Sequence, residues 1–223
     1  SKTLIQPLLE QRLVEFNQSL ATFLSIDIKS PATKLILSGE EKSPTSVSMV
    51  YAGHQFGGFS PQLGDGRGVL LGEVKGQDGF LYDLHMKGAG PTPYSRRGDG
   101  RAVLRSCIRE YLASESMAAL SVPSSRALAL YDSKQAVYRE TPEAGAMLLR
   151  VAQGHIRFGH FEYFFYQGKP AELDQLINYC LQHYYPDCLT TDSPLENMLI
   201  EVVKRTARMI AKWQSIGFQH GVM

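Results

Sequence analysis

The sequence predicts an α+β fold whose first part combines strands with one helix and whose second part is helical. Three observations predict it. Strand-like residues 67–74 and 80–87 are joined by an Asp78-Gly79 pair, which favours a hairpin turn. From Gly100 onward, apolar residues recur with a period near 3.6. After residue 153 the periodic segments are all helical. We therefore expect a strand-rich part, residues 1–152, and a helical part, residues 153–223.

The chain opens with a segment typical of an amphipathic helix. Apolar residues recur at helical spacing over residues 8–26, and the region of Pro31 follows as a break. Residues 46–56 predict a short helix or turn that leads into a glycine-rich segment from 57 to 72. The two strands named above begin at the end of this segment.

The later elements are a helix, two strands and three more helices. Asp99 stands at the N-cap position of the helix that is expected from Gly100. Strands are predicted at 136–140 and 146–152, and helices at 158–166, 170–184 and 193–216. This order resembles the small β-sheet lobe of a protein kinase with its αC-type helix. In that comparison, a hinge near Gln153 leads to the first helices of a truncated large lobe.

Composition and charge exclude several classes of function. The 223 residues are 43% apolar and 20% charged, as in ordinary globular proteins, and the formal net charge is +1. Such a charge gives no overall attraction to nucleic acid or to acidic membranes, and we expect neither as a partner. Basic residues nevertheless gather locally, which indicates a small anion: Arg96, Arg97, Arg101, Arg105 and Arg109.

Cysteines and histidines indicate neither a disulfide framework nor a metal site. Cys107, Cys180 and Cys188 are odd in number and form no CxxC pair, and the histidines lack metal-ligand spacing. A reducing cytosolic environment is therefore expected. No apolar run approaches the ~20 residues that span a bilayer, and the first residues show no signal-peptide pattern. Without an initiator Met, the chain is expected to start inside a longer or processed sequence.

The stretch from residue 63 to 101 carries two glycine-flanked Asp-Gly-Arg triplets. In the first, Gly64 and Gly66 allow the backbone to turn sharply and approach an anion, and Arg67 adds a charged donor. The alternative is a plain hairpin turn, because Asp-Gly is common in such turns. The second triplet contains Asp99 and Gly100. No GxSxG or GxxxxGK[ST] motif is present, so a serine hydrolase or P-loop enzyme finds no support.

A strand lysine and a helix glutamate complete the pattern by which kinase-like folds bind phosphates. Lys87 ends a strand-like run, where its ammonium group can face a phosphate. Glu110 lies in the next predicted helix, and a lysine–glutamate ion pair of this kind orients the lysine in kinases. Taken singly, each residue is better explained as a solvated surface charge, and the case depends on the two together.

Two arginines bracket the predicted hinge. Arg150 follows an apolar run, where burial of an unpaired guanidinium is costly, so it requires a carboxylate or a bound phosphate. Arg157 is the weaker candidate, because it stands at a predicted helix start where solvent exposure is ordinary.

Taken together, the glycine-rich strings resemble the selenoprotein O (SelO) family, which includes the bacterial YdiU proteins. The resemblance extends from about residue 8 to the last residue. The strings that carry it are Tyr51-Ala52-Gly53-His54-Gln55-Phe56-Gly57, Pro61-Gln62-Leu63-Gly64-Asp65-Gly66-Arg67, Lys87-Gly88-Ala89-Gly90-Pro91-Thr92-Pro93-Tyr94-Ser95-Arg96 and Gly98-Asp99-Gly100-Arg101-Ala102-Val103-Leu104-Arg105-Ser106.

The resemblance implies a pseudokinase that transfers AMP from ATP to hydroxyl groups of proteins, with Mg or Mn. ATP is held in a flipped pose that exposes its α-phosphate, and bacterial members have also been linked to UMP transfer from UTP with Mn. Protein substrates are the implied partners, in the cytoplasm of a bacterium or in mitochondria if the source is eukaryotic. The implied nucleotide-binding residues are Gly64, Gly66, Arg67, Lys87, Asp99, Gly100, Arg150 and Arg157, with Glu110 as the ion-pair partner of Lys87.

The chain departs from the family pattern where it ends. The family's catalytic aspartate and the Asn and Asp that hold the metal are expected beyond Met223, so no catalytic or metal residue is assigned here, and the chain alone is expected to be inactive. An apolar stripe over residues 193–216 is expected to pack against the lobe beyond Met223, and in this chain to be left exposed or covered by self-association. Two rivals stay open: ordinary phosphoryl transfer, and a nucleotide-binding or redox-linked interaction protein without catalysis.

Overall fold

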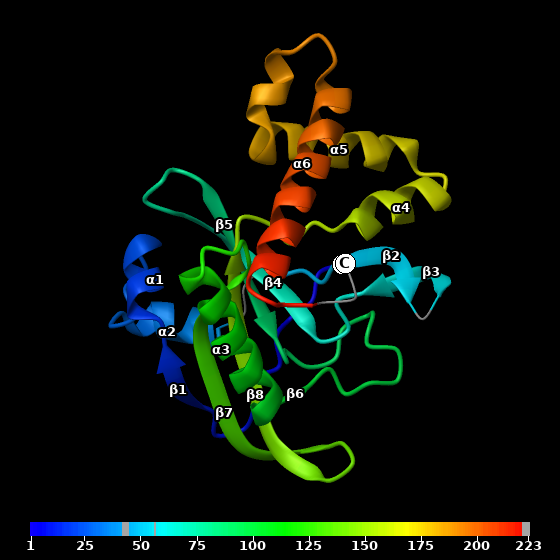
Figure 1. Ribbon diagram of the computed structural model, residues 1–223. Coiled ribbons are helices and arrows are strands. Elements are labelled where there is room, and N and C mark those ends of the chain that lie inside the picture. The colour runs from blue at the N-terminus through cyan, green and yellow to red at the C-terminus, as the bar shows by residue number, and fades with distance from the viewer. Residues whose placement is uncertain (42–44, 56, 220–223) are drawn as a thin grey trace.

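The computed structural model describes residues 1–41, 45–55 and 57–219. Phe56, at the end of the segment predicted as a short helix or turn, and residues 220–223 lie outside this description. The elements along the chain (Figure 1) are β1 (Arg12–Phe16), α1 (Gln18–Phe23), α2 (Pro31–Ser38), β2 (Val50–Gln55), β3 (Gly58–Gly64), β4 (Gly68–Lys75), β5 (Leu81–Lys87), β6 (Ala102–Val103), α3 (Leu104–Ala119), β7 (Arg126–Tyr138), β8 (Pro142–Ala152), α4 (Phe158–Tyr166), α5 (Pro170–Tyr184), the 3₁₀ helix η1 (Pro186–Thr190) and α6 (Pro194–Ser215).

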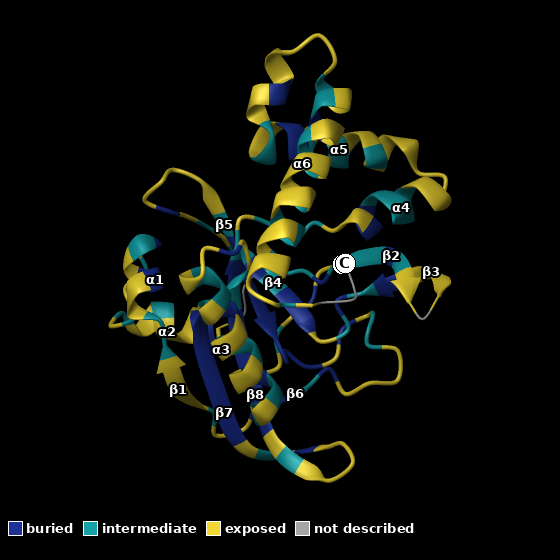
Figure 2. Ribbon diagram, viewed as in Figure 1, coloured by how far each residue is buried: buried dark blue, intermediate teal, exposed yellow. Residues whose placement is uncertain are grey.

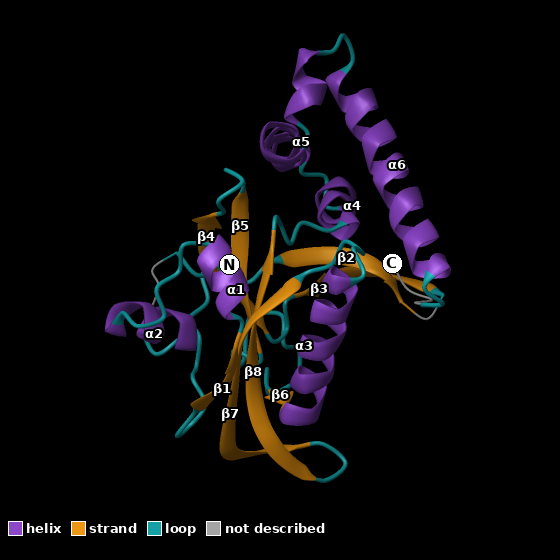
Figure 3. Ribbon diagram, turned by 60° about the vertical axis from the view of Figure 1, so that its left-hand side comes forward, coloured by secondary structure: helices purple, strands orange, loops and turns teal. Residues whose placement is uncertain are grey.

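The fold is α+β and is built around one antiparallel sheet. Its strands run in the order β1-β7-β8-β5-β4, with the short β6 beside β8, and β2 pairs with β3 in a separate ribbon. Figure 3 shows α1 and α2 on one side of the large sheet and α3 on the other. Each side has its own buried cluster: Leu20, Leu24 and Met147 belong to the first, and Cys107 and Leu148 to the second. The sheet is thus covered on both faces.

Strand alternation decides which side chains of β5 and β8 face α3. In β5, Leu84 and Met86 pack in the cluster beneath α1 and α2, so His85 and Lys87 face the opposite side. The antiparallel register places His85 directly across from Arg150 of β8. Period-two geometry therefore brings polar groups of both strands together on the face that α3 covers.

Several predicted elements are confirmed. The helices at 158–166 and 170–184 match α4 and α5, and the strands at 67–74 and 80–87 match β4 and β5 to within one residue at each end. These segments were recognisable because each is bounded by a Gly or Pro at a turn. The predicted order of two strands, a helix and two strands is also present, as β4, β5, α3, β7 and β8.

Two helix predictions in the first part are wrong. In place of a helix over 8–26, β1 pairs with β7, and Asn17 then caps the short α1 through its side-chain oxygen. Leu13 and Val14 of β1 remain exposed, because β1 is an edge strand of the sheet. The apolar residues over 8–26 therefore belong to a strand followed by a short helix, and their helical spacing does not mark one continuous helix. Residues 50–55 of the predicted short helix or turn form β2, because they pair with β3. Tertiary pairing overrides local preference in both places.

The predicted start of α3 and the extent of β7 also need correction. Asp99 does not cap the helix: Ala102 and Val103 pair with β8, and α3 begins at Leu104. β7 begins at Arg126, ten residues before the predicted strand at 136. Its first part is buried on both faces, so the alternation that would mark a strand is missing there.

The helical part packs around a small cluster of its own. Cys180, Leu181, Cys188 and Met198 are buried between α5, η1 and α6. All three cysteines are buried and unpaired in the described chain. No helix that the structure describes is both long enough and apolar enough to cross a bilayer.

Most of α6 is exposed to solvent (Figure 2), and several of its exposed residues are apolar. Leu195, Leu199 and Val203 are each more than half exposed, and Val202, Met209 and Trp213 of the predicted stripe are half-buried. Apolar patches of this kind commonly mark interaction surfaces. The predicted self-association is not tested by a single chain.

We expect the 223-residue chain to self-associate through these apolar residues of α6, because association removes apolar area from water. Light scattering should give a mass above the 24.8 kDa of one chain, and Leu199→Lys with Val203→Lys should restore the monomer. Leu112→Lys is the matched control, since Leu112 is an exposed leucine of α3. A wild-type chain that stays monomeric at all concentrations would contradict this expectation.

Candidate functional site

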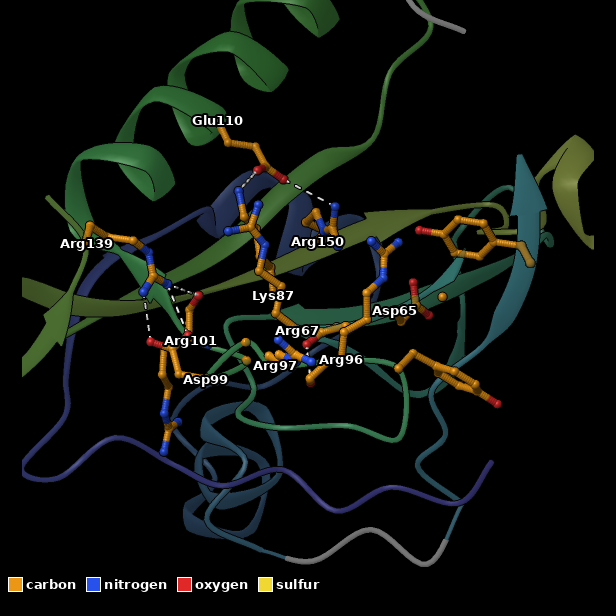
Figure 4. A pocket seen from close by; sticks show the side chains of 18 of the residues that line it. Asp65, Arg67, Lys87, Arg96, Arg97, Asp99, Arg101, Glu110, Arg139 and Arg150 are labelled. Carbon is orange, nitrogen blue, oxygen red and sulfur yellow. Dashed lines mark hydrogen bonds and ion pairs between the residues drawn. The ribbon is translucent and has the colours of Figure 1, made fainter. Parts of the chain in front are cut away.

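A cavity of about 900 Å³ lies where the loop after β3, the strands β5 and β8, and the first turns of α3 meet. It is the place where the structure brings together the residues singled out from the sequence. Figure 4 shows several of them pointing into the same space. All nine line the cavity: Gly64, Gly66, Arg67, Lys87, Asp99, Gly100, Glu110, Arg150 and Arg157.

The loop at residues 64–67 is not a hairpin turn. Gly64 ends β3, which pairs with β2, whereas Gly68 begins β4, which pairs with β5. The loop therefore connects two sheets and lies at the cavity wall. The hairpin alternative from the sequence is excluded.

The glycines of this loop are required by packing within the chain. A Cβ at Gly64 would lie 2.5 Å from the ring of Tyr94, and one at Gly66 would lie 2.9 Å from the Tyr94 carbonyl oxygen. The same segment is tied down by hydroxyls, since Thr92 donates to the Asp65 carbonyl at 2.7 Å and Ser95 donates to that of Gly66. The sequence argument attributed these glycines to an approaching anion. Within the chain, the absence of side chains at these positions admits the segment after Gly90 as a second wall of the cavity.

Lys87, Glu110 and Arg150 form one connected group of charges. Lys87 Nζ donates to Glu110 Oε2, and Arg150 Nη1 lies 3.4 Å from Glu110 Oε1. The expected ion pair between Lys87 and Glu110 is thus present, as the dashed lines in Figure 4 show. Burial lowers the pKa of Arg150, and Glu110 opposes this effect. A carboxylate therefore supplies the anionic partner that the sequence demanded for Arg150.

Asp99 belongs to a second ionic group on another side of the cavity. Arg139 Nη1 lies 2.8 Å from Asp99 Oδ2, and Arg139 also donates to the Arg101 carbonyl at 2.9 Å. The hydrogen bond from Arg139 holds the pKa of Asp99 below its usual value. Asp99 therefore stays ionised. It stabilises this wall of the cavity through the ion pair with Arg139 and by accepting a hydrogen bond from the Arg101 backbone N–H at 2.9 Å.

Arg157 stands at the start of α4 and faces the cavity from the helical part. Its guanidinium lies 5.0 Å from the centre of the Tyr51 ring, a cation–π contact between α4 and β2. Its backbone N–H donates to His160 Nδ1 at 2.8 Å. The cation–π contact and the backbone hydrogen bond together hold the exposed Arg157 guanidinium at the edge of the cavity.

The cavity is strongly basic. Among the residues that line it, arginines and lysine outnumber carboxylates: Arg67, Lys87, Arg96, Arg97, Arg101, Arg139, Arg150 and Arg157 against Asp65, Asp99 and Glu110. Within residues 1–41, 45–55 and 57–219, no carboxylate forms an ion pair with five of the lining arginines: Arg67, Arg96, Arg97, Arg101 and Arg157. A bound polyanion would balance this excess of positive charge.

The same residues do not fit a divalent cation. Glu110 is occupied by Lys87 and Arg150, and Asp99 by Arg139. Asp65 is buried, and its Oδ2 accepts from the Met49 N–H at 3.1 Å and lies 3.4 Å from His85 Nε2. Over the described ranges, no cluster of three or more His, Cys, Asp or Glu has an arrangement that would hold a metal.

Sequence reasoning missed part of the cavity lining. Tyr51 and Tyr94 lie within the family strings, but nothing in their spacing marked them as site residues. Arg139 carries no local signal, since only the long β7–β8 hairpin brings it to Asp99. Conversely, Arg105 of the basic cluster does not line the cavity but pairs with Glu143.

Comparison with known proteins agrees with the resemblance seen in the motifs. The family described as "Protein adenylyltransferase SelO" matches residues 2–223. A protein of Marinomonas sp. (strain MWYL1) named "Protein nucleotidyltransferase YdiU" is 89% identical over 223 residues, which is all of this chain and 47% of that protein. Proteins of the same name from Pseudoalteromonas atlantica and Pseudomonas putida are 52% and 50% identical over 95% and 100% of the chain, and 45% and 47% of their own lengths.

The chain thus spans about half the length of the curated relatives it matches. The family match covers nearly every residue, including the strings that line the basic cavity. The chain belongs to the SelO family.

Proposed function

We propose that the protein to which this chain belongs transfers AMP from ATP to hydroxyl groups of Ser, Thr or Tyr in other proteins, and that this chain holds the distal phosphates of ATP. One observation carries the proposal: five arginines that form no ion pair with a carboxylate of the described chain line the same cavity as the Lys87–Glu110 pair. Such a cavity suits several adjacent negative charges. The family description and the names of the relatives support nucleotidyl transfer.

The arrangement of Lys87 and Glu110 supports a kinase-like role for the sheet and α3. In kinase-like folds, a strand lysine held by a helix glutamate contacts nucleotide phosphates. Here the lysine ends β5 and the glutamate lies two turns into α3. We infer that β4, β5, α3, β7 and β8 correspond to a small kinase lobe, and that the helices after residue 153 begin a large lobe.

The chemical role of the cavity follows from where charge develops. When AMP is transferred, the bond between the α- and β-phosphates breaks, and pyrophosphate leaves with additional negative charge. Lys87, Arg150 and the unpaired arginines would stabilise this leaving group by charge-assisted hydrogen bonds already in position. A divalent cation, Mg or Mn, would neutralise phosphate charge when bound. Because the described carboxylates do not fit it, we propose that its ligands and the catalytic carboxylate lie beyond residue 223.

The test follows radioactive phosphate in a chimaera in which this chain replaces the segment it matches in the Marinomonas relative. With Mg²⁺ or Mn²⁺, label should reach protein from α-labelled ATP and not from γ-labelled ATP. Label from the γ-phosphate would indicate phosphoryl transfer instead. Preference for α-labelled UTP would indicate UMP transfer. ATP binding without any transfer would indicate a binding protein.

The 223-residue chain provides the accompanying control. It should bind ATP in calorimetry but transfer no label, because the proposed catalytic and metal-binding groups are outside it. Robust protein labelling by the chain alone would place those groups within it and overturn this part of the proposal.

A further inference from the structure

His85 is a fully buried polar side chain that the proposed phosphate chemistry does not use. It lies on β5 two residues before Lys87, on the same face of the sheet, and its side chain is 0% exposed. It is absent from the lining of the basic cavity, so it cannot touch a bound nucleotide there. Space around it is tight, because a Cβ at Gly68 would lie 2.4 Å from His85 Cε1.

The contacts of His85 fix its protonation state. Arg150 Nη2 lies 2.9 Å from His85 Nδ1. A guanidinium can only donate, so Nδ1 must accept, and the ring proton is assigned to Nε2. That nitrogen lies 3.4 Å from Asp65 Oδ2, a carboxylate that is itself 3% exposed. Burial lowers the pKa of His85 to about 4, so the ring is neutral near pH 7.

A second histidine, His155, fixes the orientation of the His85 ring by stacking on it. His155 stacks on His85 with ring centres 4.6 Å apart and planes 19° apart. His155 Nδ1 in turn lies 3.0 Å from Asp83 Oδ2. Stacking on one side and Gly68 on another leave the imidazole little freedom to rotate, so the acceptor atom Nδ1 has a fixed direction.

These contacts connect His85 to the cations that face the cavity. Arg150 bonds through Nη2 to His85 and approaches Glu110 through Nη1. Glu110 accepts from Lys87 through its other oxygen. A series of polar contacts therefore connects His85 to Arg150, Arg150 to Glu110, and Glu110 to Lys87. The first of these contacts follows from the cross-strand pairing of His85 with Arg150.

We propose that His85 is a positioning residue: its neutral imidazole accepts from Arg150 and thereby fixes the guanidinium that contacts the distal phosphates. The proposal rests on the proposed function, because it requires that Arg150 bind phosphate. Without the acceptor, the guanidinium rotates between Glu110 and the ligand, and a bidentate or directed contact with phosphate is lost.

Two variants separate positioning from stability. His85→Leu is similar in size but has no acceptor, whereas His85→Asn keeps a carbonyl oxygen near the position of Nδ1. We expect the Leu variant of the 223-residue chain to bind ATP about tenfold more weakly by calorimetry, the value of one hydrogen bond to a charged group. The Asn variant should recover most of this loss even if its melting temperature is the lower of the two. Affinity that follows melting temperature instead would overturn the proposal.

A double-mutant cycle tests whether the effect passes through Arg150. In an Arg150→Ala background, His85→Leu should cause no further loss of ATP affinity, because the group it positions is gone. Full additivity of the two losses would contradict the proposal. If the wild-type chain binds ATP and His85→Leu binds equally well, this inference fails and the proposed function stands. If the wild-type chain does not bind ATP, both fail.

A measurement on the unaltered chain keeps the proposal testable should the variants not fold. Nitrogen-15 NMR of the imidazole at pH 7 should show a neutral ring protonated on Nε2. A ring protonated on Nδ1, or an imidazolium, could not accept from Arg150 and would overturn the proposal.

Discussion

AMP transfer by the chimaera is expected to fall about 100- to 1,000-fold when Lys87 is replaced with alanine, the loss typical of removing one group that stabilises developing charge. The change removes a buried ammonium group, 9% exposed, from the cavity wall. It also leaves Glu110 with Arg150 as its remaining cation there. The ATP affinity of the 223-residue chain should fall as well, because Lys87 would contact phosphate in the ground state. Labelled-ATP transfer and calorimetry measure the two effects.

Lys75→Ala is the matched control for this experiment. Lys75 is also the last residue of a strand, β4, but it is exposed and does not line the basic cavity. It should leave transfer and affinity unchanged. A Lys87→Ala protein that transfers AMP at the wild-type rate would contradict the phosphate-binding role, as would an equal loss in both variants.

The fold could be predicted where the chain marks its own boundaries. α4 and α5 were recovered to the residue, since turn residues and a change of period delimit them. β2 could not be recovered, because Val50–Gln55 becomes a strand only by pairing with β3. The first half of β7 was missed for a related reason: a strand buried on both faces has no alternation to detect.

The residues that line the site could be predicted better than the contacts that hold them in place. Nine residues were named from the sequence, six of them within the motif strings, and the fold places all nine around one cavity. What the strings could not reveal was how the residues are held. Glu110 was expected as the partner of Lys87, but its simultaneous approach to Arg150 depends on the register between β5 and β8. Nothing in the sequence singled out His85, because its significance lies in a cross-strand contact with Arg150.

The largest loss of stability is expected for Gly100→Ala. Gly100 is buried with φ +66°, a left-handed conformation that is strained for alanine. An added Cβ would lie 2.0 Å from the Gly90 carbonyl oxygen. The two backbones are joined by a hydrogen bond, with Gly90 N–H donating to the Gly100 carbonyl at 3.1 Å. Relief of the overlap must separate them, so we expect a loss of about 3 kcal/mol or more in unfolding free energy.

Gly168→Ala is the matched control, because it separates the cost of backbone strain at positive φ from the cost of steric overlap. Gly168 follows α4 with nearly the same angle, φ +63°, but no atom lies within 4 Å of its Cβ position. Only the conformational cost applies, about 1 kcal/mol. Urea unfolding of the 223-residue chain measures both values. Equal losses would show that the Gly90–Gly100 contact does not constrain the chain.

Because Gly100 also lines the basic cavity, the clash should displace Asp99 and weaken ATP binding, whereas Gly168→Ala should leave binding intact.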